Sequence, residues 1–247
     1  MDYFDKFNSK KLIKDLIYAF FFASLIRTFL YEPFVIPSGS MLPNFLVGDR
    51  LIVEKFTYGY NKYSFPLNAF PVTQKFLVKD MPDYGESVVF RMPEHNNEHY
   101  IKRVIGKSGD VIEMKNGIVF INKKPNKQKF IQEAPMEIMN MSIKAYLYLE
   151  EDQNGKKYYI YRLSKKGNMP EDNMAPIRIP EGHYFMMGDN RNNSKDSRFA
   201  YMGFVPFEQI VGKAKIVFFS SDGDFYEIWK WKSDMKFNRI GKIVDKI

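Results

Sequence analysis

Residues 111–121 read Val-Ile-Glu-Met-Lys-Asn-Gly-Ile-Val-Phe-Ile. The dipeptide Asn116-Gly117 separates two short, largely apolar runs. Asn-Gly is the strongest short-range signal for a two-residue β-hairpin, because both of its residues tolerate the positive φ that such a turn requires. We therefore predict antiparallel strands over residues 111–115 and 118–121.

The same alternation of apolar and polar residues, interrupted by turn residues, continues on both sides of this hairpin. A second, longer hairpin is predicted around Asn154-Gly155. No long helical period appears after residue 40, so the pattern predicts a mostly β protein. The further predicted strands cover residues 51–56, 87–92, 100–106, 145–149, 158–163, 183–187 and 213–219.

The chain divides by composition into an antiparallel β-sheet core and an insertion. Residues 120–178 are rich in Lys, Asn and Pro and indicate an inserted, smaller β-rich lobe. The core then consists of residues 34–119 and 179–247. A chain of 247 residues can form one large or two small domains.

An apolar stretch near the N-terminus predicts a membrane anchor. Four lysines within residues 6–14 precede the apolar run 16–26, which resumes after Arg27. Counted through Arg27, the stretch reaches the length of a transmembrane helix, roughly 17–25 residues. Large side chains follow the run, whereas a cleaved signal peptide needs small ones. The lysines place the N-terminus in the cytoplasm. Residues 1–33 are thus expected to form a cytoplasmic tail and a transmembrane helix, with the remainder exported.

The composition excludes several classes of protein. Hydrophobic residues make up 45% of the chain and aromatic residues 17%, which excludes a disordered chain. The chain has no cysteine, so disulfides, thiol nucleophiles and thiolate metal sites are excluded. The net charge of +8 suits an anionic partner such as a phospholipid surface. A nucleic-acid role rests on charge alone, and an exported domain would not meet nucleic acid.

The C-terminal stretch interleaves basic and apolar residues, among them Trp229, Trp231, Phe237, Arg239 and Ile240. Such a stretch can lie on a membrane surface. It can equally form an amphipathic terminal helix that packs on the domain, and the sequence leaves both interpretations open.

A serine-containing turn offers a candidate nucleophile. Residues 36–43 read Ile-Pro-Ser-Gly-Ser-Met-Leu-Pro, so Ser38 and Ser40 flank Gly39 between two prolines. Glycine lets the backbone approach a bound group, and nearby N–H groups can stabilise an oxyanion. Taken alone, Ser-Gly-Ser is more often an ordinary loop than an active site.

A serine nucleophile needs a base, and the sequence offers histidine or lysine. His95 and His99 are four residues apart, which allows a shared metal on a helix, but their polar surroundings favour a solvated loop. Lys102 lies in the strand Tyr-Ile-Lys-Arg-Val-Ile-Gly, residues 100–106. If its side chain points inward, burial lowers its pKa and makes it a general base. Alternation alone does not decide whether Lys102 or Arg103 faces inward.

A polar segment follows the strand predicted over residues 183–187. Residues 187–198 read Met-Gly-Asp-Asn-Arg-Asn-Asn-Ser-Lys-Asp-Ser-Arg. Such a segment can fill a hydrogen-bond network around a buried lysine, although by composition alone a solvated surface loop is the better interpretation.

Taken in order, the three segments resemble the type I signal peptidases, the membrane-bound serine–lysine proteases of bacteria. The resemblance is carried by YEPFVIPSGSMLP at 31–43, GDRLIVEKFTYG at 48–59, YIKRVIG at 100–106 and GDNRNNSKDSR at 188–198. The resemblance covers residues 31–110 and 179–211. Within these residues the sequence is similar to signal peptidases of the Gram-negative type. The middle of the chain shows no such match.

The resemblance implies a role for each matched residue. It implies that Ser40 is the nucleophile, that Lys102 is the general base, and that Ser38 joins the Ser40 N–H in an oxyanion hole. Supporting roles fall on Ser194, which orients the lysine amine, on the pair Asp196 and Arg198, and on the pair Asp189 and Arg103. The implied walls of the substrate pockets are Phe34, Ile36, Pro37, Met41, Tyr100 and Ile101. Three residues depart from the family pattern: Asn192, Lys195 and Phe45, of which Phe45 could narrow a pocket.

The resemblance also implies partners and a location. The expected substrates are preproteins with Ala-X-Ala before the cut, presented at a phospholipid membrane, with no cofactor or metal. The expected location is the bacterial inner membrane, with a single pass and the β core on the periplasmic side. Self-cleaving repressor proteases resemble the same core but carry a DNA-binding domain in place of an anchor. A membrane-tethered binding module without catalysis is the other alternative, and it requires Ser40 and Lys102 to be far apart or exposed.

Overall fold

The computed structural model describes residues 9–65, 72–92, 98–138, 141–223 and 231–246. Helix α1 spans Ser9–Phe29, and a single helical turn, α2, spans Trp231–Asp234. Short 3₁₀ turns lie between strands. They cover Gly39–Met41, Lys62–Ser64, Pro170–Asp172, Phe207–Gln209 and Phe237–Arg239.

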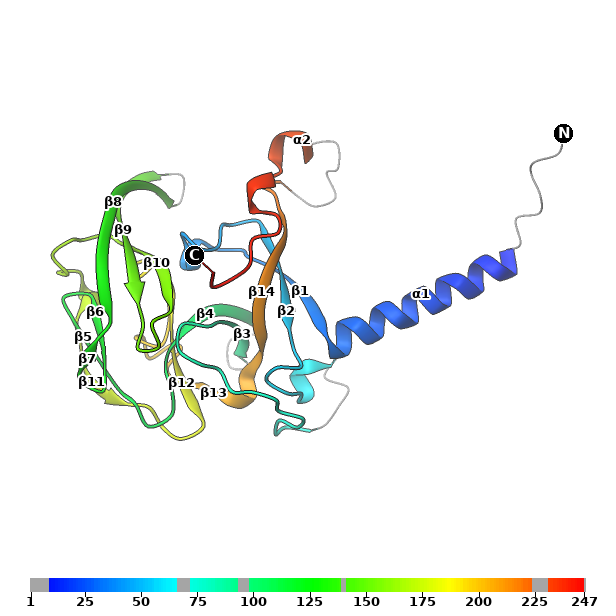
Figure 1. Cartoon of the computed structure of the whole chain (residues 1–247), viewed down its shortest axis with the longest axis horizontal. Helices are drawn as coiled ribbons and strands as arrows, with labels where there is room; N and C mark the ends of the chain where they lie inside the picture. Colours follow the sequence, from blue (N-terminus) through cyan, green and yellow to red (C-terminus); the bar gives the residue numbers. More distant parts are fainter. Residues whose placement is uncertain (1–8, 66–71, 93–97, 139–140, 224–230, 247) are drawn as a thin grey trace.

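A seven-stranded antiparallel sheet forms the core of the molecule (Figure 1). Its strands follow the order β1-β2-β14-β3-β4-β12-β13. Strand β14 joins the two halves of this sheet, because it pairs with β2 on one side and β3 on the other. The bounds are β1 Tyr31–Val35, β2 Asp49–Glu54, β3 Ser87–Met92, β4 Glu98–Gly106, β12 His183–Met187, β13 Val205–Pro206 and β14 Ile210–Ser220.

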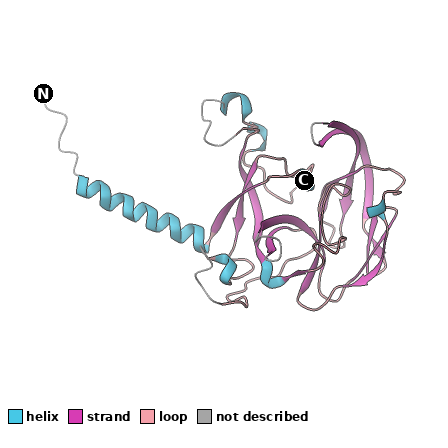
Figure 2. Ribbon diagram, turned by 180° about the vertical axis from the view of Figure 1, so that it is seen from behind, coloured by secondary structure: helices cyan, strands magenta, loops and turns pink. Residues whose placement is uncertain are grey.

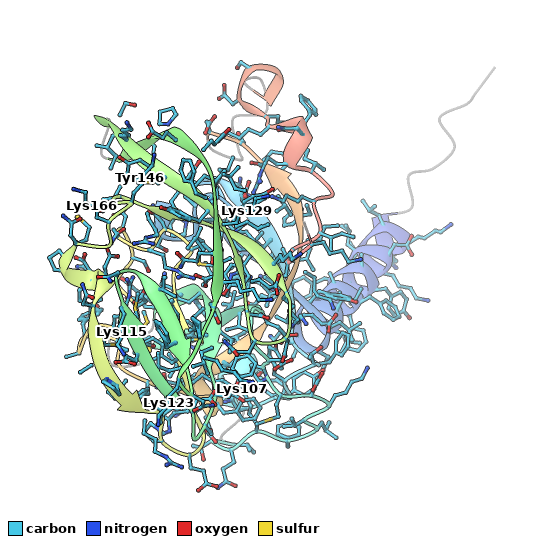
Figure 3. All side chains as sticks on the ribbon, turned by 60° about the vertical axis from the view of Figure 1, so that its left-hand side comes forward. Lys107, Lys115, Lys123, Lys129, Tyr146 and Lys166 are labelled. Carbon is cyan, nitrogen blue, oxygen red and sulfur yellow. The ribbon has the colours of Figure 1, made fainter. Side chains whose placement is uncertain are left out.

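Two smaller antiparallel sheets lie beside the core, at the left of Figure 1. One has the order β11-β5-β6-β7 and the other the order β10-β9-β8. Their bounds are β5 Val111–Lys115, β6 Ile118–Ile121, β7 Lys124–Pro125, β8 Lys127–Ile138, β9 Met141–Glu151, β10 Lys157–Arg162 and β11 Met174–Arg178. The labelled lysines of Figure 3 lie on or beside these sheets, and Lys115, Lys123 and Lys129 are exposed.

The prediction of a mostly β, antiparallel protein is confirmed. The hairpin at 111–121 forms as predicted, with Lys115 paired to Ile118 and with positive φ at Asn116 and Gly117. The hairpin around Asn154-Gly155 forms between β9 and β10. The division into a core and a 120–178 lobe stays a prediction. The four-stranded sheet joins strands from both parts, since β5 belongs to the predicted core and β7 and β11 to the predicted lobe.

The core packs against both faces of the large sheet. Val88, Phe90 and Met92 of β3 point into one apolar cluster, and Val89 points into another. Successive side chains of a strand point to opposite faces, so β3 is buried on both. A third cluster fills the space between the core and the four-stranded sheet and includes Ile105 and Ile112.

The predicted anchor region folds as helix α1, which extends away from the domain (Figure 2). Its apolar side chains point outward, with Ile17 61% and Phe20 76% exposed. Within the described residues, no helix combines the length and apolar character needed to cross a membrane. The predicted transmembrane helix is therefore not confirmed.

Of the C-terminal stretch, residues 231–246 are described, and they form one helical turn and one 3₁₀ turn in place of a long helix; Trp229 lies outside the described residues. After the turn at Phe237–Arg239 the chain extends along β14, where Ile243 pairs with Ile216 and Val244 N donates to Lys215 O at 2.8 Å. Arg239 forms an ion pair with the buried Asp49. We call residues 239–246 the C-terminal strap.

Candidate active site

The loop that carries Ser40 is fixed by buried residues on either side of the serine. Ile36 and Met41 are buried in the core beside β2. Ile36 N donates to Asp49 O at 2.8 Å, which ties the start of the loop to β2. Ser40 lies in the 3₁₀ turn Gly39–Met41 and is only partly buried. The backbone is thus anchored while the hydroxyl of Ser40 stays accessible.

Lys102 reaches Ser40 from strand β4. Its Nζ lies 2.7 Å from Ser40 Oγ, within hydrogen-bond reach. The Lys102 side chain points inward and only 3% of the residue is exposed. The ambiguity between Lys102 and Arg103 is resolved in an unexpected way, because both side chains are buried, on opposite faces of β4.

The surroundings of Lys102 favour a neutral amine. Burial lowers the pKa of Lys102 from 10.5 to about 8, because the ammonium is separated from water. The carboxylates of Asp196 and Asp189 act in the opposite direction, and the Arg198 guanidinium adds to the lowering. Near pH 8 about half of the molecules then carry a Lys102 amine that can accept a proton.

The loop after β12 lies against Ser40 and Lys102. Asp196 is buried and accepts hydrogen bonds from Arg198 Nε and Nη2, both at 2.8 Å, and from Gly188 N at 3.0 Å. Asn190 N donates to Ser40 O at 3.1 Å, and Asn190 Nδ2 donates to Gly39 O at 3.0 Å. The loop therefore holds the backbone of the serine turn directly.

A second polar cluster lies on the other face of β4. Arg103 donates to Asp189 through Nε at 2.7 Å and Nη2 at 2.6 Å. Asn44, four residues after Ser40, donates to Asp189 Oδ2 at 2.6 Å. The predicted pair of Asp189 and Arg103 thus connects strand β4, which carries Lys102, with the loop after β12 and with the loop that carries Ser40.

The two other serines lie close to the pair. Ser38 Oγ is 3.4 Å from Ser40 Oγ, on the exposed side of the turn. Ser194 Oγ is buried and makes no hydrogen bond within the described part of the chain. A Cβ on Gly188 would lie 2.3 Å from Ser194 Oγ and 2.5 Å from Ser40 O, so only glycine lets these groups approach each other here.

A cavity of about 240 Å³ opens in front of Ser40 and Lys102. Five of the six predicted wall residues line it, namely Phe34, Ile36, Pro37, Tyr100 and Ile101. Met41 does not line the cavity and is buried in the core instead. The sequence did not identify four further lining residues, Val35, Val89, Glu98 and His99.

The three departures from the family pattern lie away from this cavity. Asn192 Nδ2 donates to Asp172 Oδ1 at 3.1 Å, which ties the loop to the neighbouring small sheets. Phe45 is buried in the core and lines a separate small cavity with Arg103. Lys195 lies 6.0 Å from the ring of Tyr201. Phe45 therefore does not narrow the cavity in front of Ser40.

The histidines do not contact the Ser40–Lys102 pair in the described part of the chain. His95 lies outside the described residues, and His99 packs edge-on against Phe34 with ring centroids 5.1 Å apart. Sequence reasoning missed Asn44, Asn190 and Asp245 as polar contacts of the site, of which Asp245 accepts a hydrogen bond from Arg103. Of these three, only Asn190 lies within residues 187–198, the polar segment that its sequence shows to be able to form a hydrogen-bond network.

Comparison with known proteins identifies similar chains. The family model "Signal peptidase, peptidase S26" matches residues 9–219. The signal peptidase I of Buchnera aphidicola subsp. Schizaphis graminum is 35% identical over 265 residues, which cover 94% of this chain and 80% of the relative. The signal peptidase I of Rickettsia prowazekii is 36% identical over 242 residues, which cover 94% and 88%. A solved signal peptidase I from Enterococcus faecalis V583 is 21% identical, covers 54% of this chain and 97% of its own, and has a TM-score of 0.31, a slight similarity.

Proposed function

Because this chain belongs to the signal peptidase family, peptidase S26, we propose that it removes signal peptides from exported preproteins with Ser40 as nucleophile and Lys102 as general base. The observation that carries this proposal is the 2.7 Å separation of Lys102 Nζ and Ser40 Oγ. The burial of Lys102 supports it, since a neutral amine can take the serine proton.

The reaction follows from these positions. The neutral Lys102 amine accepts the proton of Ser40 Oγ as the oxygen attacks the scissile carbonyl carbon. The resulting oxyanion lies near Ser40 N–H and the Ser38 hydroxyl, which stabilise it. Lys102 returns the proton to the leaving amine, and an ester-linked acyl-enzyme remains. Lys102 then takes a proton from water, whose oxygen attacks the ester carbonyl, and returns that proton to Ser40 Oγ as the signal peptide leaves as a carboxylic acid.

The supporting residues act on the position of this pair. Asp196 and Arg198 fix the shape of the loop after β12 from within, and Asn190 of that loop binds the serine turn. Ser194 lies beside Gly188 with an unused hydroxyl, and we assign to it the orientation of the Lys102 amine, which stays a prediction because the two groups form no hydrogen bond here.

The substrate is proposed to carry Ala-X-Ala before the cut. The cavity in front of Ser40 is small and is walled by Ile36, Pro37 and Ile101 among other residues. Apolar walls of this kind suit small apolar side chains such as that of alanine. Five of the six residues that the family pattern assigns to these pockets line the cavity, which supports the same preference.

We further propose that helix α1 holds the enzyme at the bacterial inner membrane, with the β domain on the periplasmic side. The support is the exposure of its apolar side chains and the lysines at its N-terminal end. The preprotein's own apolar segment is then presented at the same surface as the site.

The test compares the full chain in detergent with two variants, Ser40→Ala and Lys102→Ala, on a preprotein with an Ala-X-Ala site. We expect cleavage at the bond after the second alanine by the unaltered enzyme and none by either folded variant. Cleavage by Lys102→Ala at the original rate would refute the lysine base. A non-catalytic tethered module requires that none of the three proteins cleaves, and the contact between Ser40 and Lys102 argues against it.

A further inference from the structure

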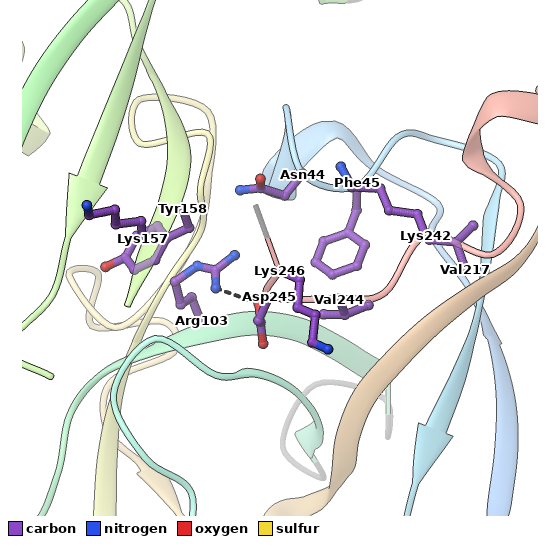
Figure 4. Close-up of a pocket in the computed structure, with 10 residues that line it drawn as sticks. All are labelled: Asn44, Phe45, Arg103, Lys157, Tyr158, Val217, Lys242, Val244, Asp245 and Lys246. Atoms are coloured by element: carbon purple, nitrogen blue, oxygen red, sulfur yellow. Dashed lines mark hydrogen bonds and ion pairs between the residues drawn. The ribbon is translucent and has the colours of Figure 1, made fainter. Parts of the chain in front are cut away.

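The C-terminal strap places the carboxylate of Asp245 beside strand β4, which carries Lys102. Asp245 Oδ1 accepts a hydrogen bond from Arg103 Nη1 at 2.6 Å, and the two groups form an ion pair (Figure 4). Arg103 follows Lys102 directly and is only 1% exposed. Residues 245 and 103 are 142 positions apart, so this contact is made only in the folded chain.

Asp245 also binds the neighbouring strand. Ser87 N and Ser87 Oγ of β3 both donate to its carboxylate at 2.8 Å. Ser87 is the β3 partner of Arg103, and Val88 is the partner of Lys102. One side chain of the strap thus binds β3 and β4 at the position next to the lysine.

The contacts of Arg103 show what Asp245 adds. Two of its nitrogens donate to Asp189, the third donates to Gly85 O at 2.6 Å and to Asp245, and its guanidinium lies 4.1 Å from the centre of the Tyr158 ring. Each of the three guanidinium nitrogens thus donates at least one hydrogen bond, which holds the buried cation in one position. A cavity of about 20 Å³, room for about one water, lies between Arg103, Asp245 and Phe45.

The strap itself is anchored ahead of this contact, by its backbone and by the side chain of Arg239. Val217 N donates to Lys242 O at 3.0 Å, and Arg239 Nη2 donates to Asn44 O at 2.8 Å. Asn44 belongs to the loop of Ser40 and also donates to Asp189. The strap therefore contacts both the nucleophile loop and the base strand.

We infer that Asp245 is a positioning residue, which acts through Arg103 and Ser87 to hold β4 in the position where the Lys102 amine meets Ser40. The inference rests on the proposed function, since Lys102 must be the base for its position to set the rate. Asp245 does not line the cavity in front of Ser40, so the carboxylate should affect the chemical step and leave substrate binding unchanged.

The test uses the full-length enzyme with Asp245→Asn, which keeps the shape of the side chain and removes its charge. We expect kcat per folded molecule to fall roughly tenfold, as for loss of one hydrogen bond to a charged group, with KM unchanged. Asp245→Glu should restore part of the rate, because it returns the charge. Lys246→Ala alters the next, exposed residue of the strap and should match the unaltered enzyme.

A second readout does not depend on cleavage. Acetylation of Lys102 by acetic anhydride, followed by mass spectrometry, should be faster in Asp245→Asn, because the amine leaves Ser40 and meets solvent. If Asp245→Asn lowers only the melting temperature, with kcat and Lys102 acetylation unchanged, Asp245 has a structural role alone and the inference is wrong. If the unaltered enzyme does not cleave the preprotein, the proposed function fails, and the acetylation rates still decide whether Asp245 positions Lys102.

Discussion

Lys102 and Arg103 are neighbours in the sequence and are both almost fully buried, yet their surroundings differ. Successive side chains of a strand point to opposite faces, so Lys102 meets Ser40 while Arg103 meets Asp189 and Asp245. Two carboxylates compensate the charge of Arg103, whereas the hydrogen bond of Lys102 goes to a neutral hydroxyl. The strand thus keeps one cation charged and makes the other easy to deprotonate.

The first prediction at this scale concerns pH. Since Lys102 must be neutral to accept the serine proton, kcat/KM should rise with pH through a midpoint near the lowered pKa of about 8. The measurement is a pH–rate profile on a preprotein between pH 6 and 10, within the range where the enzyme stays folded by circular dichroism. A profile that is flat across this range would argue against a lysine base.

The Lys102→Met variant tests the same lowered pKa through the stability of the fold. Because folding lowers the pKa of Lys102 from 10.5, the unfolded chain binds the proton more tightly, and the buried lysine destabilises the fold at pH values below about 8. This cost disappears as the pH rises toward 10.5. The free energy of unfolding of the inactive Lys102→Met variant should therefore exceed that of the unaltered enzyme at pH 7 by on the order of 3 kcal/mol. Its melting temperature, measured by circular dichroism, should be higher at pH 7, and the difference should shrink at alkaline pH.

At the scale of elements, local information decided which strands were predictable. The hairpin of β5 and β6 could be predicted because its turn and both strands lie within eleven residues, 111–121. Strand β8 was not predicted, because its sequence is polar and contains Pro135. It lies at the edge of its sheet, where proline is tolerated, and its long pairing with β9 overrides its weak propensity.

The same limit applies to the site. Ser40 and Lys102 could be chosen from short segments, but alternation cannot show that both Lys102 and Arg103 are buried, since the burial of both faces of β4 depends on distant elements. Asp245 could not be identified, because its contact with Arg103 is set by how the strap packs against β14.

The prediction at this scale concerns the contact between β9 and the loop after β12. Glu150 and Arg191 are both fully buried and form two hydrogen bonds, at 2.9 Å and 2.5 Å. Glu150→Gln leaves the Arg191 charge without its counter-ion, which costs about 3–5 kcal/mol. We expect a fall in melting temperature of roughly 10 °C, measured by circular dichroism.

Glu151→Gln provides the matched control on the same strand. Glu151 points to the opposite face of β9, where it pairs with Lys127 and Lys157 in solvent. Its replacement should leave the melting temperature unchanged. Equal melting temperatures for the two variants would mean that the pair of Glu150 and Arg191 does not hold the loop to β9.

At the scale of the whole molecule, the site is assembled from distant parts of the chain. The nucleophile comes from the loop after β1, the base from β4 and the support from the loop after β12, while Tyr161 O of β10 accepts a hydrogen bond from Arg191 N at 3.0 Å. Helix α1 meets this assembly through its C-terminal half, where the Phe29 ring packs against Tyr60 and Phe65 and where Phe20 and Ser24 line a cavity with residues of the β domain. The site and the proposed membrane helix are therefore separable.

The last prediction follows from this separation. A variant without residues 1–25 keeps Phe29 and the Arg27 carbonyl that accepts from Lys55, so its β domain should fold and cleave a short Ala-X-Ala peptide as fast as the full chain. On a preprotein held in phospholipid vesicles it should be slower by roughly 10²-fold or more, because it loses the effective concentration that a shared membrane provides. The same preprotein in detergent is the control, where the difference should shrink. Equal rates on vesicles would show that α1 does not bring the site to the membrane, whereas loss of peptide cleavage would show that α1 also shapes the site.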